Sequence, residues 1–557
     1  MKSFVNKILI FVAVMAVVGG AGWFGRKAYK KTMERRLVAE AKHYIDKKDF
    51  HNASLSLQRA LELNPVSVSA SEAMADMLET AGNPAALNWQ MRAAKLDPSN
   101  ANKRLHWAEL AIKANDLNSA TEALNGLDAK SKTTADYYKL EGALAWSIHD
   151  MHAAETNYLE AARLEPANAS VQMNLATIHM TSTNEAVAQA GRAAMEAVAT
   201  NADLRIGALH QLLGDAINHK SLKRAEFYSA QIAKSPQALA EDKVEYLELL
   251  RQNQNAEYST WLAALEKNAQ TSAGDAFALA RWKVVTSGPA NALHWIASLP
   301  RQTQTNLPVP LVMTDCQIAL KDWRAILSEV TQQDWAAANY YKLALESLAE
   351  RSLSQSAAAD VSWHRAFRLS AHRLDRLTRL AEVTDVWQWK AERVDVLSEI
   401  IDEFPQEHWA LDQLSTQWYA EGKTAEMESL FFKVYSKDPT NPRYKNNLAN
   451  LYLLRKTELD KACEMAKEAY DSSTNNPFFA STYAYALLLQ DKKTEALDVA
   501  NGVKAEYLKI PSVALYYGLV QAQSGRLEVA REALKRAQAG HLLPEEKAIM
   551  QVAESKM

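Results

Sequence analysis

The sequence contains only two cysteines, Cys316 and Cys463, in 557 residues. Because they lie far apart, they offer neither a disulfide framework nor a Cys-x-x-Cys metal site. Glycine (17) and proline (15) are also scarce for this length, which favours helices over strands and turns. The chain has no His-Glu-x-x-His, no Gly-x-Ser-x-Gly and no phosphate-binding Gly-x-x-x-x-Gly-Lys motif. We therefore expect a protein that is not an enzyme and needs no cofactor or metal.

Charge is distributed unevenly along the chain. Residues 1–36 carry eight lysines and arginines against one acid, Glu34, although the net charge of the whole chain is −3. The rest of the chain has 55 basic residues against 65 acidic ones, a net charge of −10. Such a body lacks the positive surface that grips phosphates, so we expect no nucleic-acid partner.

Only one long apolar run occurs, from Ile8 to Phe24. As a helix it covers roughly 25 Å, close to the thickness of a bilayer's hydrocarbon core. Gly20, Gly22 and Gly25 fit the dinucleotide-binding pattern Gly-x-Gly-x-x-Gly, but the sequence continues as helix without the required second strand. We therefore predict a short N-terminal tail (1–7), a transmembrane anchor (8–25) that contacts the lipid bilayer, and a basic juxtamembrane segment (26–36).

The charges that flank this run predict the orientation. Six lysines and arginines follow the run and two precede it, so the positive-inside rule places the body in the cytoplasm. The expected location is thus the cell membrane, crossed once. A cleaved signal peptide is the alternative, because Lys2 and Lys7 form a basic n-region and Gly19–Ala21 offers a small-residue cleavage site. The protein would then be an exported, periplasmic adaptor.

From residue 34 onward the sequence repeats with a period of 33 or 34 residues. Small residues recur at Ala53, Ala86, Ala120, Ala154, Ala188, Ala325, Ala359, Ala462, Ala496 and Ala530. Prolines mark unit ends at Pro65, Pro98, Pro166, Pro236, Pro405 and Pro439. A fixed period of this length indicates a solenoid, in which each unit buries its apolar face only against its neighbours.

Each unit is predicted to be two amphipathic helices joined by a short polar turn. This pattern resembles the tetratricopeptide repeat (TPR) family, on residues that include Ala53, Leu57, Ala60 and Pro65 near the start and Tyr517, Gly518, Ala530, Leu534 and Ala537 near the end. The resemblance implies an all-α fold, a right-handed superhelical α-solenoid. The start "GWFGRKAYKK" is also similar to the anchor of bacterial membrane-tethered TPR proteins that assist envelope assembly. One such family ends in a cysteine-rich metal module, which this sequence lacks.

The quality of the repeat predicts the division of the body. Regular repeats give way to degenerate ones in the middle, where the aromatic and small positions are often replaced. Ten of the 14 tryptophans lie between Trp261 and Trp418, and Trp295 and Trp363 fall where a second helix meets the core. We predict N-terminal TPR-like repeats (34–239), degenerate helical repeats (240–339), C-terminal TPR-like repeats (340–543) and a polar capping helix or tail (544–557).

The TPR resemblance also implies a groove for a peptide, lined by the second, fifth, ninth and twelfth positions of each first helix. The residues at these positions that we single out are Trp409, Asp412, Tyr419, Arg443, Asn446, Asn450, Phe478 and Tyr485. Aromatic rings beside amides and one guanidinium suit an extended or helical peptide, because the amides bond the backbone and the rings supply apolar contact. The alternative is that these eight residues are solvated surface residues that bind no peptide.

Two histidine pairs are the remaining candidates for chemistry. His149 and His152 flank Asp150 in a predicted turn, without a third convergent ligand, and His364 and His372 are predicted two turns apart on one helix. Neither pair makes a convincing metal site. The leading hypothesis is a non-enzymatic, membrane-tethered scaffold that binds protein or peptide partners, with a role in envelope or secretion-related assembly. An RNA-binding helical-repeat protein is the alternative from another class.

Overall fold

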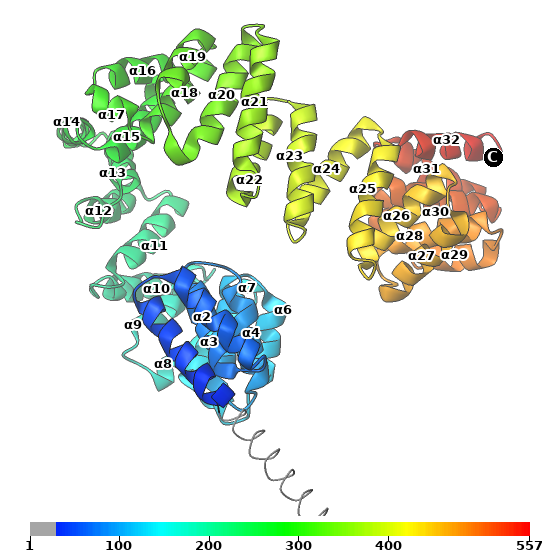
Figure 1. Cartoon of the computed structure of the whole chain (residues 1–557), viewed down its shortest axis with the longest axis horizontal. Coiled ribbons are helices and arrows are strands. Elements are labelled where there is room, and N and C mark those ends of the chain that lie inside the picture. The colour runs from blue at the N-terminus through cyan, green and yellow to red at the C-terminus, as the bar shows by residue number, and fades with distance from the viewer. Residues whose placement is uncertain (1–28) are drawn as a thin grey trace, which may run out of the picture. The chain divides into compact units, whose positions relative to one another are not determined.

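The computed structural model describes residues 29–557, and throughout this range all regular structure is helical (Figure 1). The chain divides into two compact units, one up to Val312 and one from Met313, and the division falls inside helix α18 (Val309–Ala319). The predicted boundaries at residues 239 and 339 stay predictions. The predicted all-α repeat fold is confirmed.

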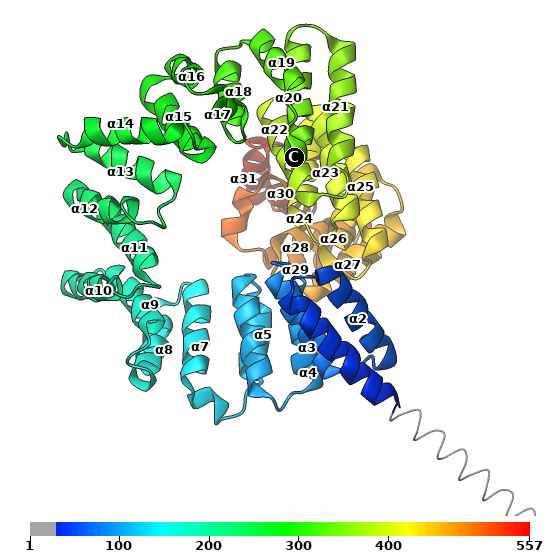
Figure 2. The same ribbon diagram turned by 60° about the vertical axis from the view of Figure 1, so that its left-hand side comes forward.

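The first unit begins with a helix over residues 29–46 and continues as a series of short helices. These are α2 (Phe50–Leu63), α3 (Val68–Thr80), α4 (Ala86–Leu96), α5 (Ala101–Lys113), α6 (Leu117–Asn125), α7 (Ala135–Ser147), α8 (Met151–Leu164), α9 (Ala169–Met180), α10 (Glu185–Val198), α11 (Arg205–Asn218), α12 (Leu222–Ala233), α13 (Ala240–Gln252), α14 (Tyr258–Ala269), α15 (Ala273–Ser287), α16 (Pro289–Ala297) and α17 (Arg301–Thr305). In Figure 2, α5 and α7 stand side by side.

The second unit continues the same pattern to the end of the chain. After α18 come α19 (Trp323–Gln332), α20 (Asn339–Ser352), α21 (Ser356–Ser370), α22 (Leu374–Val386), α23 (Lys390–Glu403), α24 (His408–Glu421), α25 (Thr424–Lys437), α26 (Pro442–Arg455), α27 (Leu459–Ser472), α28 (Pro477–Leu489), α29 (Lys493–Asn501), α30 (Pro511–Gln523), α31 (Leu527–Gln538) and α32 (Pro544–Glu554). Short 3₁₀ turns stand at Ser131–Thr133, Ala336–Ala338 and Ala505–Lys509.

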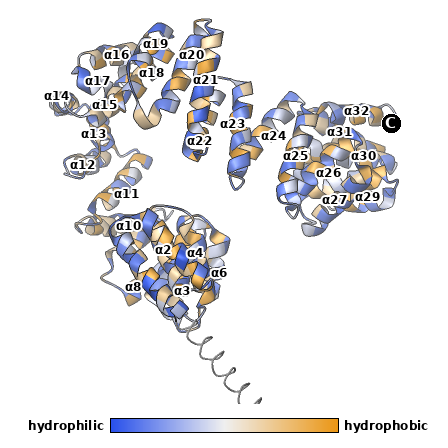
Figure 3. Cartoon of the chain, viewed as in Figure 1, coloured by the Kyte–Doolittle hydropathy of each residue, from blue (hydrophilic) through white to orange (hydrophobic). Residues whose placement is uncertain are grey.

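Consecutive helices pair into hairpins. Pairing runs from the helix over 29–46 with α2 up to α30 with α31, which gives fifteen hairpins within residues 29–543 and leaves α17 and α32 outside the pattern. Apolar and polar residues alternate around most helices (Figure 3). Each helix therefore has an apolar face that only a neighbouring helix can cover.

Small residues stand where the helices of a hairpin come closest. Nine of the ten repeating alanines are buried, whereas Ala325 is half-buried. A glycine allows the tightest approach: a Cβ at Gly191 on α10 would lie 2.7 Å from the backbone nitrogen of Met180 on α9. The periodic alanines of the sequence are therefore the contact points of the hairpins, because larger side chains there would push the helices apart.

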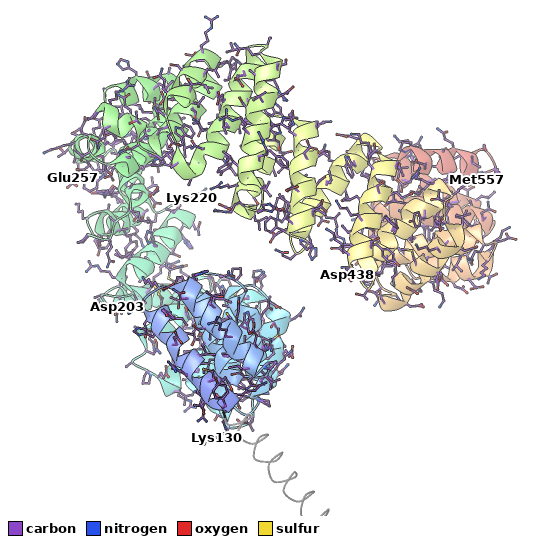
Figure 4. The ribbon with its side chains drawn as sticks, viewed as in Figure 1. Lys130, Asp203, Lys220, Glu257, Asp438 and Met557 are labelled. Carbon is purple, nitrogen blue, oxygen red and sulfur yellow. The ribbon has the colours of Figure 1, made fainter. Side chains whose placement is uncertain are left out.

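The turns inside fourteen of the fifteen hairpins, all but that between α9 and α10, contain a residue with a positive φ that recurs along the chain. These residues are Lys48, Gly82, Asn115, His149, Lys220, Gln254, Gly288, Lys321, Ser354, Gln388, Gly422, Lys456, Asp491 and Gly525. They follow one another at intervals of 33, 34 or 35 residues, except for one interval of 71 between His149 and Lys220 (Lys220 is labelled in Figure 4). The repeat therefore keeps its phase through the middle of the chain, where the sequence pattern is weakest.

Local sequence signals set the helix ends. Asp49, Asn100, Asp116 and Asn168 each stand before a helix and accept a hydrogen bond from a backbone N–H of its first turn. Such caps satisfy donors that have no partner inside the helix. The six periodic prolines all follow a second helix by two or three residues, for example Pro65 after α2, as expected of a residue that cannot continue a helix.

Aromatic residues fill the core where the small-residue pattern is lost. Around Leu247, Leu265 and Leu279 in the first unit, the partly buried side chains of Trp261, Trp282 and Trp295 complete the packing. In the second unit, Trp363 on α21 is buried, and its ring centroid lies 5.6 Å from that of Trp389. The two tryptophans predicted to fill the stack, Trp295 and Trp363, both do so, although Trp295 is only partly buried.

The prediction of a single-pass membrane protein with its body in the cytoplasm has to be corrected. Among residues 29–557, no helix has the length and apolar character needed to cross a bilayer. The helix over residues 29–46 carries many charged side chains, and every later helix has at most 15 residues, because most are one half of a hairpin. The segment 8–25, on which the membrane anchor and the lipid contact were predicted, lies outside the described residues.

Two glycines in helix interiors test the close approach of the hairpins. We expect Gly191→Ala to lower the free energy of unfolding by about 1–2 kcal/mol. The new methyl group overlaps the backbone of α9, and the energetic cost of this overlap exceeds the gain from the higher helix propensity of alanine. Gly214→Ala on α11 is the matched control: its Cβ would meet nothing within 4 Å, so we expect a gain of about 0.5–1 kcal/mol. Urea unfolding followed by circular dichroism measures both. A shift of the two variants in the same direction would contradict the close-contact interpretation.

Candidate functional site

The eight residues predicted to line a groove all lie on three first helices of the second unit. Trp409, Asp412 and Tyr419 belong to α24, whereas Arg443, Asn446 and Asn450 belong to α26, and Phe478 and Tyr485 belong to α28. Neighbouring first helices touch, α26 with α28 and α28 with α30. We call the surface that carries these residues, together with the adjoining part of α30, the first-helix face.

Near the N-terminal ends of these helices, the first-helix face is open. Arg443 forms an ion pair with Asp412, and the two side chains remain 49% and 46% exposed. Phe478 is 46% exposed, and the half-buried Trp409 donates from its indole nitrogen to Glu407 at 3.0 Å. We call Trp409, Asp412, Arg443 and Phe478 the open half of the face. At this exposure the ion pair contributes little stability, about 0.2–1 kcal/mol.

Farther along the same helices, the face is covered by the chain's own last helix, α32. Figure 1 shows α32 lying over α26 and α30, with which it is in contact. The Tyr419 hydroxyl donates to the Glu546 carboxylate at 2.9 Å and also lies 3.2 Å from the His541 carbonyl. The Thr424 hydroxyl donates to Glu545 at 2.6 Å. These hydrogen bonds connect the first of the second unit's last four hairpins, α24–α25, with the helix that follows the last of them.

A tyrosine that the sequence did not single out connects the covered residues. The hydroxyl of Tyr516, on α30, donates to Asn450 Oδ1 at 2.7 Å and lies 3.4 Å from Glu546. Its ring stacks on that of Tyr485 with centroids 4.9 Å apart. We call Tyr419, Asn450, Tyr485 and Tyr516 the closed half of the face. Because a hydroxyl has one proton, the shorter contact to Asn450 takes it, and Glu546 receives its firm hydrogen bond from Tyr419.

Burial makes the closed half electrostatically unusual. Glu546 is 1% exposed, and this loss of water raises the pKa of its carboxyl above the ordinary value of 4.5, although hydrogen bonds from the Leu543 N–H and the two tyrosines oppose the shift. Burial also raises the pKa of Tyr485 to about 12 and that of Tyr516 well above its usual 10. Burial therefore shifts all three side chains towards their neutral forms.

One predicted residue is buried without being satisfied. Asn446 is 3% exposed, and its Oδ1 has no hydrogen-bond partner among the described residues. Its side-chain nitrogen lies 3.4 Å from Asn447 Oδ1, a long contact. A buried amide oxygen without a partner costs about 1–3 kcal/mol, so Asn446 lowers stability where it stands.

The histidine and cysteine candidates do not assemble into a site. His149 is the positive-φ residue of the α7–α8 turn, and His152 is on α8, whose N-terminus is capped by Asp150 between them. His364 lies on α21, but His372 lies beyond its end at φ 59°, so the prediction that they share a helix is wrong. Within residues 29–557, no three His, Cys, Asp or Glu side chains gather around a possible metal position. Burial raises the pKa of the Cys316 thiol to about 11.

Sequence reasoning missed Tyr516, Glu545 and Glu546. The segment 544–557 was predicted to be a polar cap, and at its start Glu546 forms one half of a capping box by accepting from the Leu543 N–H at 2.9 Å. That motif predicts where a helix begins, but not that Glu546 is also buried against another helix. Only the return of α32 onto the face gives these residues a second role.

Comparisons with known proteins return matches only among solved structures. No protein-family model and no curated protein matches the chain. Similar solved structures include PilF of Pseudomonas aeruginosa (17% identity, 40% of this chain and 99% of that one, TM-score 0.31). Others are the APC/C heterotetramer Cut9–Hcn1 (12%, 93% and 99%, 0.27) and Naa15/Naa10 bound to HypK-THB (14%, 90% and 75%, 0.25). These neighbours are TPR-type repeat proteins, and this chain is similar to them in being an array of helical hairpins.

The buried carboxyl of Glu546 predicts a pH dependence of α32 docking. Its pKa is higher in the folded state than in the unfolded chain, so its contribution is fully present below about pH 4.5 and is lost as the pH rises through the raised folded value. We expect the hydrogen-exchange protection of α32, corrected for intrinsic exchange rates, to fall as the pH rises from about 4.5 through the raised folded pKa of Glu546. In Glu546→Gln, which cannot ionise, the protection should change much less over this range. Equal pH profiles would exclude Glu546 as the titrating group.

Two asparagines one turn apart on α26 should respond oppositely to the same substitution. Asn446→Leu removes an unpaired buried oxygen, so we expect it to raise the free energy of unfolding by about 1 kcal/mol. Asn450→Leu leaves the Tyr516 hydroxyl only its longer contact to Glu546 and should lower the free energy of unfolding by about 1–3 kcal/mol. Urea unfolding of both variants measures the difference. A loss of stability in Asn446→Leu would mean that its amide has a bonding role in the folded chain.

Proposed function

We propose that the chain is a non-enzymatic scaffold that binds a segment of a partner protein on its first-helix face. The observation that carries the proposal is that this face already holds a helix, α32, on its closed half while its open half stays uncovered. The open half offers an exposed ring, Phe478, beside the paired charges of Arg443 and Asp412. Such a surface suits a peptide that brings an apolar anchor and its own charges.

The net charge of −10 in the body supports a protein partner over RNA, because RNA binding depends on a basic face. The solved complexes of Cut9 with Hcn1 and of Naa15 with Naa10 and HypK are assemblies of proteins. Their low similarity to this chain gives no guide to its own partner. The role of the scaffold in envelope or secretion-related assembly remains part of the proposal.

The chain offers a matched pair of phenylalanines for a test. Phe478 lies on the first helix α28 and is 46% exposed, whereas Phe432 lies on the second helix α25 and is 49% exposed. A photo-crosslinking phenylalanine analogue would therefore be exposed to solvent to a similar extent at the two positions. We expect position 478, but not position 432, to form a discrete crosslink with a protein in lysate of the source cells.

The charged pair decides whether that crosslink is specific. Exchanging the partners, Asp412→Arg with Arg443→Asp, keeps an ion pair between α24 and α26 but reverses the charges that a peptide would meet. We expect the exchange to reduce the crosslink at position 478 at least fivefold without changing the circular dichroism spectrum. Equal crosslinking at positions 478 and 432, or an undiminished crosslink after the exchange, would contradict binding on this face.

A further inference from the structure

The last helix holds the first-helix face through few contacts. Of the eleven residues of α32, only Glu546 and Met550 are buried, and Val552 is 55% exposed. At the far end, Arg531 donates to the Met557 carbonyl at 3.1 Å. Most of the surface of α32 therefore faces solvent, and its apolar anchorage rests on Met550 and on the buried Leu542 and Leu543 just before the helix.

The polar contacts of α32 with the rest of the unit are made by the residues of its first turn. Pro544, at the helix start, lies against Gly422: a Cβ on that glycine would be 3.2 Å from the proline ring. Glu545 and Glu546 follow, and they accept hydrogen bonds from the hydroxyls of Thr424 and Tyr419, respectively. Acidic residues are also favoured in a first turn, where the backbone N–H groups point outward. The closed half thus recognises a helix that begins with Pro-Glu-Glu.

The burial of the Glu546 carboxyl makes an unfavourable contribution to the free energy of α32 docking. Placing the Glu546 carboxyl out of water opposes ionisation, and the hydrogen bonds that it gains replace those to water rather than adding to them. A helix held in this way opens more readily than one held by a large apolar interface.

Beyond its first turn, α32 also leaves a cleft unfilled, whose walls combine apolar side chains with charged ones such as Lys456 and Asp491. A cleft of about 840 Å³ runs between α32 and the hairpins, with walls that include Leu454, Leu488, Leu519 and Leu527 on one side and Ile549 and Val552 on the other. The open space faces the helix positions five and eight residues after Pro544. Larger apolar side chains at those two positions would bury more surface than α32 does.

Building on the proposed scaffold function, we propose that α32 is an exchangeable cover of the closed half, and that the partner segment is a helix of another protein that starts with Pro-Glu-Glu and has bulky apolar residues five and eight positions after the proline. The cover has the advantage of being tethered, because the linker after α31 keeps it at high effective concentration. The partner has the advantage of filling the cleft. Binding of the partner and release of α32 are then one event.

The test uses the full chain and two synthetic peptides. The first peptide copies residues 541–557, and the second carries Ile549→Phe and Val552→Leu in the same sequence. In the full chain with Glu546→Lys, the buried lysine should release α32 and leave the face free. We expect the first peptide to bind this chain at least tenfold more tightly than the wild-type chain, and the second peptide to bind both chains more tightly than the first.

Controls on the chain and on the peptide identify the contacts. Adding Tyr419→Phe and Tyr516→Phe to the Glu546→Lys chain should weaken binding of the first peptide at least fivefold, and a peptide with Glu546→Lys should not bind. If Glu546→Lys disturbs folding, the wild-type chain still gives an answer, because saturating second peptide should raise hydrogen exchange in α32. Unchanged exchange, or peptide binding that is insensitive to the tyrosines, would overturn the proposal.

Other outcomes separate this inference from the scaffold function. If neither peptide binds while the Phe478 crosslink persists, the scaffold function stands and the exchangeable cover is wrong. If both peptides bind but no crosslink forms, the scaffold interaction fails while the helix preference of the closed half stands. If the wild-type chain forms a dimer that Tyr516→Phe abolishes, the occupant is α32 of a second copy, which overturns the assignment to another protein.

Discussion

Every hairpin in this chain depends on a close approach of its two helices, in which small side chains of one helix contact the backbone of the other. The repeating alanines, and Gly191 where the approach is tightest, keep the crossing points free of bulk. Because no single helix can cover its own apolar face, the contact must be repeated from one hairpin to the next. The stability of each helix therefore comes mainly from its neighbours.

A second constraint keeps the stack in phase. One residue with positive φ reverses the chain inside fourteen of the fifteen hairpins, and it recurs even where the aromatic and small positions are lost. Lysine, glutamine, serine and histidine occupy this position as well as glycine and asparagine, although the conformation favours the latter two. The turn geometry is thus imposed by the helices on either side of it. His149, which looks like half of a metal site in sequence, is one of these turn residues.

The end of the second unit departs from the uniform stack. There α32 turns back and uses two glutamates to contact a tyrosine and a threonine of α24 and α25, four hairpins earlier in the chain. The first-helix face is thereby divided into an open half and a closed half with different chemistry. The proposed exchange with a partner rests on two features: polar side chains bind the first turn of α32, and the cleft beside this helix is not filled by it.

The sequence by itself determined the all-helical repeat, its period, the positions of the crossing alanines and the ends marked by prolines and caps, because these depend on neighbours within one turn or one repeat. It also singled out eight candidate residues, which lie on α24, α26 and α28. Only the tertiary structure decided that Tyr419 and Asn450 are covered while Arg443 and Phe478 are open, and that Tyr516 and Glu546 belong with them. Those contacts join residues up to 127 positions apart, so no local pattern encodes them. They exist because the stacked hairpins bring α24 and α30 within reach of the same returning helix.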